Sequence, residues 1–326
     1  MLESMEKRTH ARTMQLQARS KMVDTIALAA PADLMLGHNS RHRDLREWFR
    51  HAGACPASAR PSGSIRSPDE RGEALAGAGT ALSSRAALRS ERQEQTNMSP
   101  PFNIGFVIFP DLTQLDFTGP LQVLSRLPGA AVHIVAKSTA PVPSDCGLGL
   151  VPTHTFTSSP ALDLVCVPGG NQGVVDAIDD RETIEFVRRQ AATARYVTSV
   201  CTGAFILGVA GVLKGRRATT HWAFADLLPL VGATHEKARV VKDGNVITAG
   251  GVTSGIDFGL SVVAELAGET VARTIQLGIE YDPAPPFDSG HPDRAPAGLA
   301  SGLLSGRYGD SRSAYRAGLE RAAHKL

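Results

Sequence analysis

Residues 195–208 read RYVTSVCTGAFILG, and this stretch decides the fold. Its first part, Tyr196–Val200, combines aromatic and β-branched residues and is typical of a buried strand. The part after Cys201 is apolar and favours a helix that runs to about residue 213. Cys201 therefore lies at a sharp strand-to-helix turn, which would present its side chain at the mouth of a cleft above the sheet.

The same alternation of strands and helices continues on both sides of this turn. Expected strands cover residues 103–109, 131–137, 163–167, 196–200, 218–220, 239–241 and 245–248, and expected helices cover 113–127, 182–194, 202–213, 253–266 and 269–279. Apolar strands that alternate with helices form parallel sheets covered on both faces. We therefore expect an α/β fold: a flavodoxin-like three-layer sandwich with a mostly parallel sheet and a nucleophile elbow.

The composition of the chain changes near Met98. Residues 1–97 are rich in Arg, Ala, Ser, Gly and Pro and show little apolar periodicity, which predicts a disordered, low-complexity extension. Met98 directly precedes SPPFNIGFVIFP, which contains the first expected strand, and we consider it as an alternative start of translation. Residues 98–293 form the expected α/β domain. Residues 294–326 form an expected C-terminal tail, with a short helix from about residue 312.

The overall composition narrows the classes of function. Apolar residues make up 42% and charged residues 20% of the 326 residues, and the net charge of +2 gives no indication of a nucleic-acid partner. No run approaches the roughly 18 apolar residues of a membrane span, so no membrane partner is expected. The four cysteines show no CxxC spacing, which argues against a zinc site or a disulfide framework. Free thiols persist in a reducing compartment, so we expect a cytoplasmic protein.

Cys201 is the first candidate for a catalytic residue. A cysteine at a helix N-terminus experiences a partial positive charge, which favours the thiolate. The thiolate is the nucleophilic form of cysteine, so position and reactivity agree. The alternative is that Cys201 is a small apolar residue that closes a tight turn.

Other candidates follow neighbouring strands, whose carboxyl ends form the ligand-binding edge of such sheets. Gly169 and Gly170 follow strand 163–167, and their backbone N–H groups could form an oxyanion hole with the amide of Thr202. Asp116 follows the first strand and could exchange protons with a nearby cysteine or with water. The alternatives are a plain loop for the glycines and a helix cap at the surface for Asp116.

His221 is a weaker candidate. It follows the expected strand at 218–220 and precedes Trp222. It could orient charge near a thiolate, but a single histidine beside a tryptophan is also typical of a packing residue.

Several runs together resemble one known family: IGFVIFP, LDFTGP, DLVCVPGG, RYVTSVCTGAFILG, GRRATTHWAF and DGNVITAGGVTSGIDF. They resemble the ThiJ/PfpI superfamily, whose fold is that of class I glutamine-amidotransferase domains. The resemblance covers roughly residues 101–293, and the later run LGIEYDPAPPFDSG is most similar to the isonitrile hydratase branch.

This resemblance implies a role for each candidate residue. Cys201 would be the nucleophile, Asp116 the carboxylate that touches it, and Thr202 the hydroxyl residue beside it. Gly169 and Gly170 would lie on the oxyanion side. The implied reaction is the hydration of a small-molecule isonitrile to an N-substituted formamide through a covalent thioimidate. It needs no metal or organic cofactor, and such enzymes are usually homodimers.

The sequence also departs from other branches of the superfamily. Thr202 stands where protease-like members have a histidine, and the late His-x-Glu of the amidotransferase triad is missing. About 45 residues follow Tyr281, which is too short for the two helix-turn-helix units of a regulator of the AraC type. A glyoxalase-like enzyme or deglycase acting on α-oxoaldehydes, and a cysteine redox sensor, remain as alternatives.

Overall fold

The computed structural model describes residues 101–323, so the predictions for residues 1–97 lie outside the described residues. Within this range seven strands form one sheet in the order β10-β11-β7-β6-β1-β2-β5. They are β1 (Phe102–Val107), β2 (Ala130–Ala136), β5 (His154–Thr155), β6 (Leu164–Val167), β7 (Tyr196–Val200), β10 (Val240–Asp243) and β11 (Val246–Ala249). Two small pairs lie outside it: β3 (Val142–Pro143) with β4 (Gly149–Leu150), and β8 (Arg217–Ala218) with β9 (Thr234–His235).

The strands of this sheet are parallel except for β10, which pairs with β11 in the antiparallel direction at the edge. Strand β6 pairs with β1 on one side and with β7 on the other. Parallel neighbours place their carboxyl ends together, so the segments after β1, β6 and β7 meet at one edge of the sheet. The expected flavodoxin-like, mostly parallel α/β fold is confirmed.

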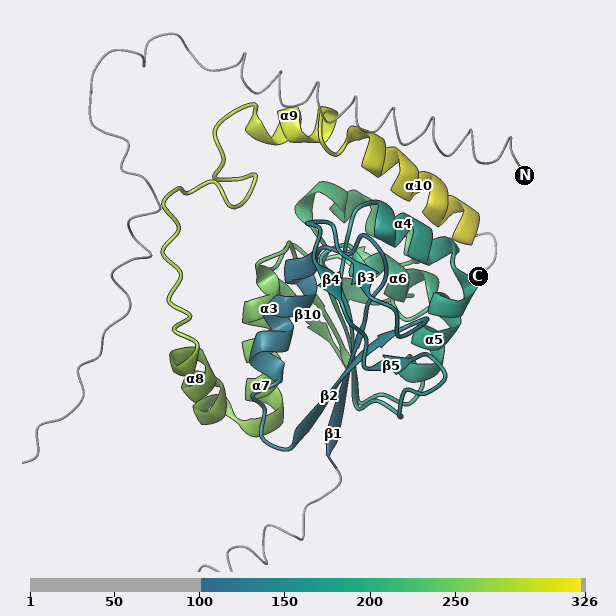
Figure 1. Ribbon diagram of the computed structural model, residues 1–326. Coiled ribbons are helices and arrows are strands. Elements are labelled where there is room, and N and C mark those ends of the chain that lie inside the picture. Colours follow the sequence, from purple (N-terminus) through teal and green to yellow (C-terminus); the bar gives the residue numbers. More distant parts are fainter. Residues whose placement is uncertain (1–100, 324–326) are drawn as a thin grey trace, which may run out of the picture. The chain divides into compact units, whose positions relative to one another are not determined.

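Helices cover both faces of the sheet (Figure 1). On one face α3 (Gln114–Leu124) packs against α7 (Ser254–Ala267), and α7 is followed by α8 (Glu269–Gly278). On the other face lie α4 (Gln172–Asp179), α5 (Arg181–Ala191) and α6 (Gly203–Val209). The remaining helices are the 3-10 helix η3 (Trp222–Val231), α9 (Leu299–Ser305) and α10 (Gly309–Ala323).

The core lies between the sheet and these helices. All four residues of β6 are fully buried, as expected for a central strand with helices on both faces. The largest buried side chains include Phe106 on β1, Phe205 on α6 and Phe258 on α7, which together represent all three layers. Full burial of each such side chain stabilises the fold by about 1.5–3 kcal/mol.

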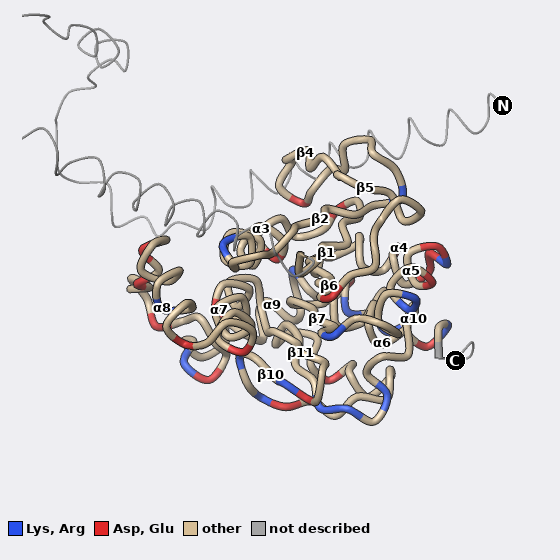
Figure 2. The backbone as a smooth tube through the Cα atoms, turned by 90° about the horizontal axis from the view of Figure 1, so that it is seen from below, with Lys and Arg blue, Asp and Glu red and all other residues tan. Residues whose placement is uncertain are grey.

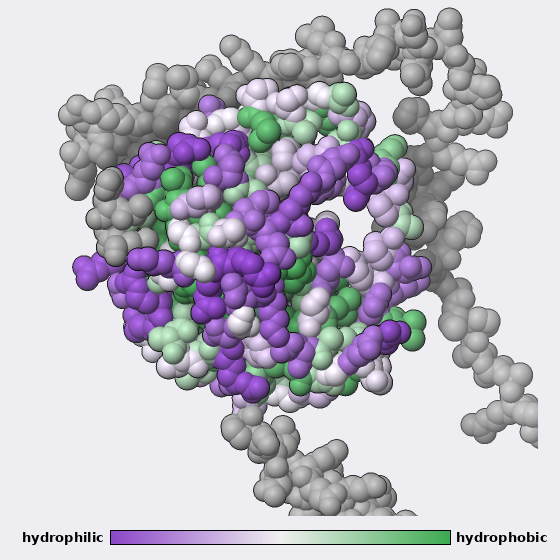
Figure 3. All heavy atoms as spheres, turned by 180° about the vertical axis from the view of Figure 1, so that it is seen from behind, coloured by the Kyte–Doolittle hydropathy of each residue, from purple (hydrophilic) through white to green (hydrophobic). Residues whose placement is uncertain are grey.

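Charged residues lie on the outer elements and mix both signs. Figure 2 shows acidic and basic positions interspersed along α5 and around β10. The face seen in Figure 3 is mainly hydrophilic, and hydrophobic atoms show between the polar ones. Every helix between residues 101 and 323 is too short or too polar to cross a membrane.

The structure contains three helices that the sequence analysis missed, namely α4, η3 and α9. The segment after Gly170 forms α4, which has only eight residues and so offers little periodicity to detect. The segment after His221 forms η3, a 3-10 helix that includes Pro229 and does not follow the 3.6-residue repeat of an α-helix.

The C-terminal region also differs from the expectation. Helix α10 has 15 residues and begins at Gly309, earlier than expected. Its side chains Tyr315, Leu319 and Ala322 are buried and pack into the main core. These positions, spaced by four and three residues, form an apolar stripe on an otherwise polar helix. The core therefore extends well beyond residue 293.

Candidate active site

Cys201 occupies a strained backbone conformation directly after β7. Its φ is 56°, in the left-handed region that residues other than glycine rarely adopt. Its N–H donates to the carbonyl oxygens of Ala249 (3.0 Å) and Gly250 (2.8 Å), and its own carbonyl oxygen accepts from Thr220 Oγ1 (2.8 Å). Such a conformation costs about 1–3 kcal/mol and persists where the surroundings enforce it. The elbow expected at Cys201 is therefore present.

Gly203 lets the helix after the elbow approach the neighbouring strand. A Cβ atom at this position would lie 2.2 Å from the carbonyl oxygen of Val167 and 2.7 Å from that of Pro168. Both are backbone atoms that no rotamer change can move. The glycine therefore brings the start of α6 against the Pro168-Gly169-Gly170 loop.

Asp116 lies in the first turn of α3 and is fully buried. Its Oδ2 accepts a hydrogen bond from the Gly169 N–H (2.9 Å), and its Oδ1 is buried without a hydrogen-bond partner. Burial raises the pKa of this carboxyl to about 7, although hydrogen bonds from Gly169 and Cys201 act in the opposite direction. Asp116 can therefore both accept and donate a proton near neutral pH.

The Cys201 thiol is buried beside this carboxyl. Burial first, and then the negative charge of Asp116, raise its pKa well above the ordinary value, and the Thr202 N–H and hydroxyl oppose this rise. The sequence analysis expected the helix N-terminus to favour the thiolate. That expectation was wrong, because the loss of solvation outweighs the dipole of a seven-residue helix. The resting form is a thiol whose proton the adjacent Asp116 can take.

Thr202 and Gly170 form a closed hydrogen-bonded unit. The Gly170 N–H donates to Thr202 Oγ1 (3.0 Å), and the Thr202 hydroxyl donates to the Gly170 carbonyl oxygen (2.8 Å). The N–H groups of Gly169 and Gly170, expected on the oxyanion side, thus already hold Asp116 and Thr202 in place. A Cβ at Gly169 would lie 2.7 Å from Asp116 Oδ2 and from Thr202 Oγ1, so only glycine fits between them.

His221 belongs to a cluster of aromatic rings. Its Nδ1 accepts a hydrogen bond from the Ala223 N–H (3.2 Å) and so caps η3. Its ring packs against those of Trp222 and Tyr308, with centroids 5.6 and 5.4 Å away. Burial lowers its pKa to about 4, so the ring is neutral at physiological pH. This geometry matches the packing interpretation rather than a charged partner of Cys201.

Two tyrosines near the site were missed by the sequence analysis. Tyr315 on α10 is fully buried, and its hydroxyl donates to the Gly170 carbonyl oxygen at 2.5 Å. Tyr308 precedes α10 and is close enough to Cys201 for the charge of the sulfur to raise its pKa, although burial has the larger effect. The two tyrosines are seven residues apart, and Leu319 and Ala322 continue the pattern. This spacing in the sequence could have indicated one buried face of a helix.

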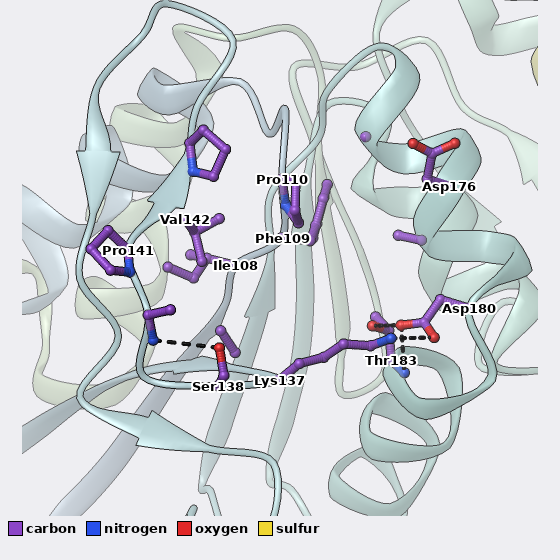
Figure 4. Close-up of a pocket in the computed structure, with 15 residues that line it drawn as sticks. Ile108, Phe109, Pro110, Lys137, Ser138, Pro141, Val142, Asp176, Asp180 and Thr183 are labelled. Carbon is purple, nitrogen blue, oxygen red and sulfur yellow. Dashed lines mark hydrogen bonds and ion pairs between the residues drawn. The ribbon is translucent and has the colours of Figure 1, made fainter. Parts of the chain in front are cut away.

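A cavity of about 690 Å³ adjoins the elbow. It is lined by Thr220 and Gly250, which hydrogen-bond the backbone of Cys201, and by His221, Trp222 and residues 290–294. A second cavity of about 410 Å³ lies where β1 and β2 end. In Figure 4 the Lys137 side chain runs towards Asp180, with which it forms an ion pair, and Phe109 lies apart from both, next to Pro110. Cys201, Asp116 and Thr202 line neither cavity.

Among residues 101–323, no group of three or more His, Cys, Asp or Glu side chains is arranged to hold a metal ion. The candidate site consists of Cys201, Asp116 and Thr202 with the backbone of Gly169 and Gly170.

Comparison with known proteins gives consistent results. Residues 103–265 match the DJ-1/PfpI family. The isonitrile hydratase of Pseudomonas putida is 57% identical over 196 residues, which are 60% of this chain and 86% of that protein. A solved ThiJ/PfpI family protein from Pseudomonas syringae has a TM-score of 0.66 and 43% identity, covering 69% of this chain and 94% of that one.

A solved DJ-1 superfamily protein from Salmonella typhimurium, in which a cysteine is replaced by alanine, has a TM-score of 0.51 and 28% identity. That match covers 56% of this chain and 99% of that one. The fold, the cysteine elbow and these matches agree with the resemblance seen in the sequence, and the chain belongs to the DJ-1/PfpI family.

Proposed function

We propose that this protein hydrates isonitriles to N-substituted formamides, with Cys201 as nucleophile and Asp116 as the group that moves protons. The observation that carries the mechanism is a cysteine thiol in a strained elbow beside a buried carboxyl whose pKa is about 7. The substrate class is supported by 57% identity to a protein named isonitrile hydratase, over most of the length of that protein.

The first half of the reaction forms a covalent adduct. The Asp116 carboxylate takes the proton of the Cys201 thiol as the sulfur adds to the terminal carbon of the isonitrile. The electron pair left on this carbon then takes a proton from the carboxylic acid of Asp116. The product is a thioimidate, R–N=CH–S, and the carboxylate is restored.

The second half adds water. Asp116 takes a proton from a water molecule, whose oxygen adds to the thioimidate carbon, and Asp116 then gives this proton to the nitrogen. The hydroxyl next gives its proton to Asp116 while the carbon–sulfur bond breaks, which releases R–NH–CHO and the thiolate. The thiolate recovers a proton from Asp116. The sum is one isonitrile and one water consumed for each formamide formed.

Thr202 stabilises the Cys201 sulfur in both halves of the reaction. Its N–H and its hydroxyl lower the pKa of Cys201, so they stabilise negative charge on the sulfur when it attacks and when it leaves. The Gly169 N–H keeps Asp116 pointed at the thiol by holding Oδ2. The chemistry therefore requires only groups of this chain and water.

The alternative of a redox sensor is less well supported. Sensor cysteines have a low pKa and are exposed to solvent, whereas Cys201 is buried and its pKa is raised.

A homodimer located in the cytoplasm is part of the proposal, and sedimentation of the purified chain tests the dimer.

The reaction itself is tested with cyclohexyl isocyanide in water enriched in oxygen-18. We expect N-cyclohexylformamide that carries one labelled oxygen, produced in proportion to enzyme and time. Absence of formamide, while a thiol reagent still modifies Cys201, would rule out hydration of this substrate class. A formamide without label would show that the oxygen does not come from water and would contradict the mechanism.

A further inference from the structure

Asp145, in the turn between β3 and β4, lies against the start of α3. Its Oδ1 accepts a hydrogen bond from the Gln114 N–H (3.1 Å), and its own N–H donates to the Leu112 carbonyl oxygen (3.0 Å). Gln114 is the first residue of α3, and Asp116 follows two residues later. A side chain from another part of the chain therefore binds the beginning of the helix that carries the Asp116 carboxyl.

The start of α3 needs such a partner. The first N–H groups of a helix find no acceptor within the helix. Among the described residues, Thr113 occupies the N-cap position of α3 but forms no side-chain capping hydrogen bond. Asp145 supplies the missing acceptor, and its negative charge suits the positive end of the helix dipole. This charge also acts on Asp116, whose pKa is raised first by burial and to a smaller extent by Asp145.

The segment that leads into α3 is held between two loops. Leu112 forms a β-bridge with Ser144 on one side and with Gly170 on the other. Next to Gly170 is Gly169, whose N–H donates to the Asp116 carboxyl (2.9 Å). The β3–β4 turn therefore supports this segment on the side away from the loop that binds the carboxyl.

The turn that carries Asp145 is itself well defined. The Ser144 N–H donates to the Leu148 carbonyl oxygen (2.9 Å), and the Leu148 N–H donates to Ser144 Oγ (3.1 Å). Ser144 is buried, and Gly147 supplies the left-handed φ of 88° that closes the turn. The Asp145 carboxyl therefore projects from a backbone that its neighbours hold in place.

The position of Asp116 matters because its carboxyl lies against the elbow. A Cβ atom at Gly169 would lie 2.7 Å from both Asp116 Oδ2 and the backbone nitrogen of Thr202, the residue after Cys201. We propose that Asp145 is a positioning residue: its carboxylate caps α3 from outside the helix and so fixes Asp116 beside Cys201. The consequence for turnover rests on the proposed function. The consequence for the thiol requires only that Asp116 takes the Cys201 proton, and no substrate.

The test compares Asp145→Asn with Asp145→Ala in the full-length protein. Both variants lose the negative charge, but only asparagine keeps an oxygen that can accept from the Gln114 N–H. The difference between the two variants therefore isolates the hydrogen bond from the charge. The first readout is the rate constant for alkylation of Cys201 by iodoacetamide at pH 7, followed by peptide mass analysis.

We expect alkylation to be about tenfold slower in Asp145→Ala than in Asp145→Asn, because the carboxyl that takes the thiol proton is displaced. With cyclohexyl isocyanide we expect the same ratio in kcat, with little difference in KM.

Asp180→Ala is the matched control. Asp180 is the N-cap of α5, which has 11 residues like α3, and its carboxyl accepts from the Thr183 N–H (3.2 Å). Helix α5 carries none of the candidate site residues. We expect this variant to melt at a lower temperature but to keep the parental alkylation rate, which separates loss of a helix cap from displacement of Asp116.

Equal alkylation rates in Asp145→Asn and Asp145→Ala would overturn the proposal. If both rates were parental, Asp145 would have no role at the site, and if both were reduced, its charge would act rather than its hydrogen bond. A parent protein that produces no formamide, with alkylation still slower in Asp145→Ala than in Asp145→Asn, would contradict the proposed function and support the role of Asp145.

Discussion

The middle of the sheet and its carboxyl edge each contain a buried cysteine, and the two cysteines differ in almost everything except burial. Cys166 lies within β6, is fully buried and has regular strand pairing with β1 and β7. Burial raises its pKa to about 12. Cys201 is 6% exposed but lies one residue beyond the end of β7, with a φ of 56°.

This difference shows which surroundings suit a buried thiol to act as the proposed nucleophile. Burial raises the pKa of both cysteines, so exposure alone does not identify the nucleophile. Only Cys201 combines the strained elbow with an adjacent carboxyl that titrates near pH 7. The chemistry proposed for the carboxyl edge therefore depends on this proton acceptor beside the thiol.

The largest effect is expected when each of the two cysteines is replaced with alanine and the activities of the two variants are compared. Cys201→Ala removes the nucleophile, and we expect isonitrile hydration to fall by at least about 10³-fold. Cys166→Ala removes a buried sulfur from the core, and we expect a loss of about 1 kcal/mol of unfolding free energy with near-parental activity. Formamide production and thermal unfolding measure the two effects. Near-parental activity in Cys201→Ala would contradict the proposal that Cys201, unlike Cys166, is the nucleophile.

The second prediction removes the proton carrier. Asp116→Asn keeps the shape of the side chain but cannot move a proton, so kcat should fall by about 10²-fold or more. Asp176→Asn, an exposed carboxyl held by Gln172, is the control and should retain parental kcat. Steady-state kinetics with cyclohexyl isocyanide measure kcat for both variants. Equal kcat values for both variants would show that hydration does not require the Asp116 carboxyl group.

The third prediction concerns the spacing of the site. In Gly169→Ala the new methyl group would lie 2.7 Å from Asp116 Oδ2 and from Thr202 Oγ1, so both must move. Displacement of this size should lower kcat by roughly tenfold to a hundredfold. Gly278→Ala places its methyl group where nothing lies within 4 Å and should leave kcat unchanged. If the two alanine variants behaved alike, the Gly169 position would have no role in the site.

The smallest expected effect is on stability. The pKa of Asp116 is about 7 in the folded protein and 3.8 ordinarily, so the folded state binds its proton more tightly. This stabilisation is complete below pH 3.8 and is lost as the pH rises through 7. Asp116→Asn cannot ionise and escapes this loss, so its melting temperature should gain several degrees relative to the parent between pH 4 and pH 8. A constant difference between the two proteins over this range would contradict the raised pKa.

Much of the fold could be predicted from the sequence. The run Tyr196–Val200 was predicted with the bounds observed for β7, because a buried central strand is apolar or β-branched throughout. The turn at Cys201 followed from the change of pattern after it. Asp116 could be selected because a carboxyl between two apolar residues is unusual and follows a strand end.

The rest of the site depends on contacts that local pattern does not encode. The contact of Tyr315 with Gly170 arises because α10 packs across α4 and η3, and no short-range signal connects residue 315 with residue 170. The direction of the Cys201 pKa also required the structure. The sequence showed a helix N-terminus, whereas the burial that overrides it comes from elements distant in the chain.

The most direct test of the account is to find the covalent adduct. The parent protein is quenched in acid during turnover of cyclohexyl isocyanide, and its peptides are mapped by mass spectrometry. We expect the peptide that contains Cys201 to gain the mass of one isonitrile, while the peptide that contains Cys166 stays unmodified. Continued formamide production in Cys201→Ala, with no adduct on Cys201 in the quenched parent, would contradict the account.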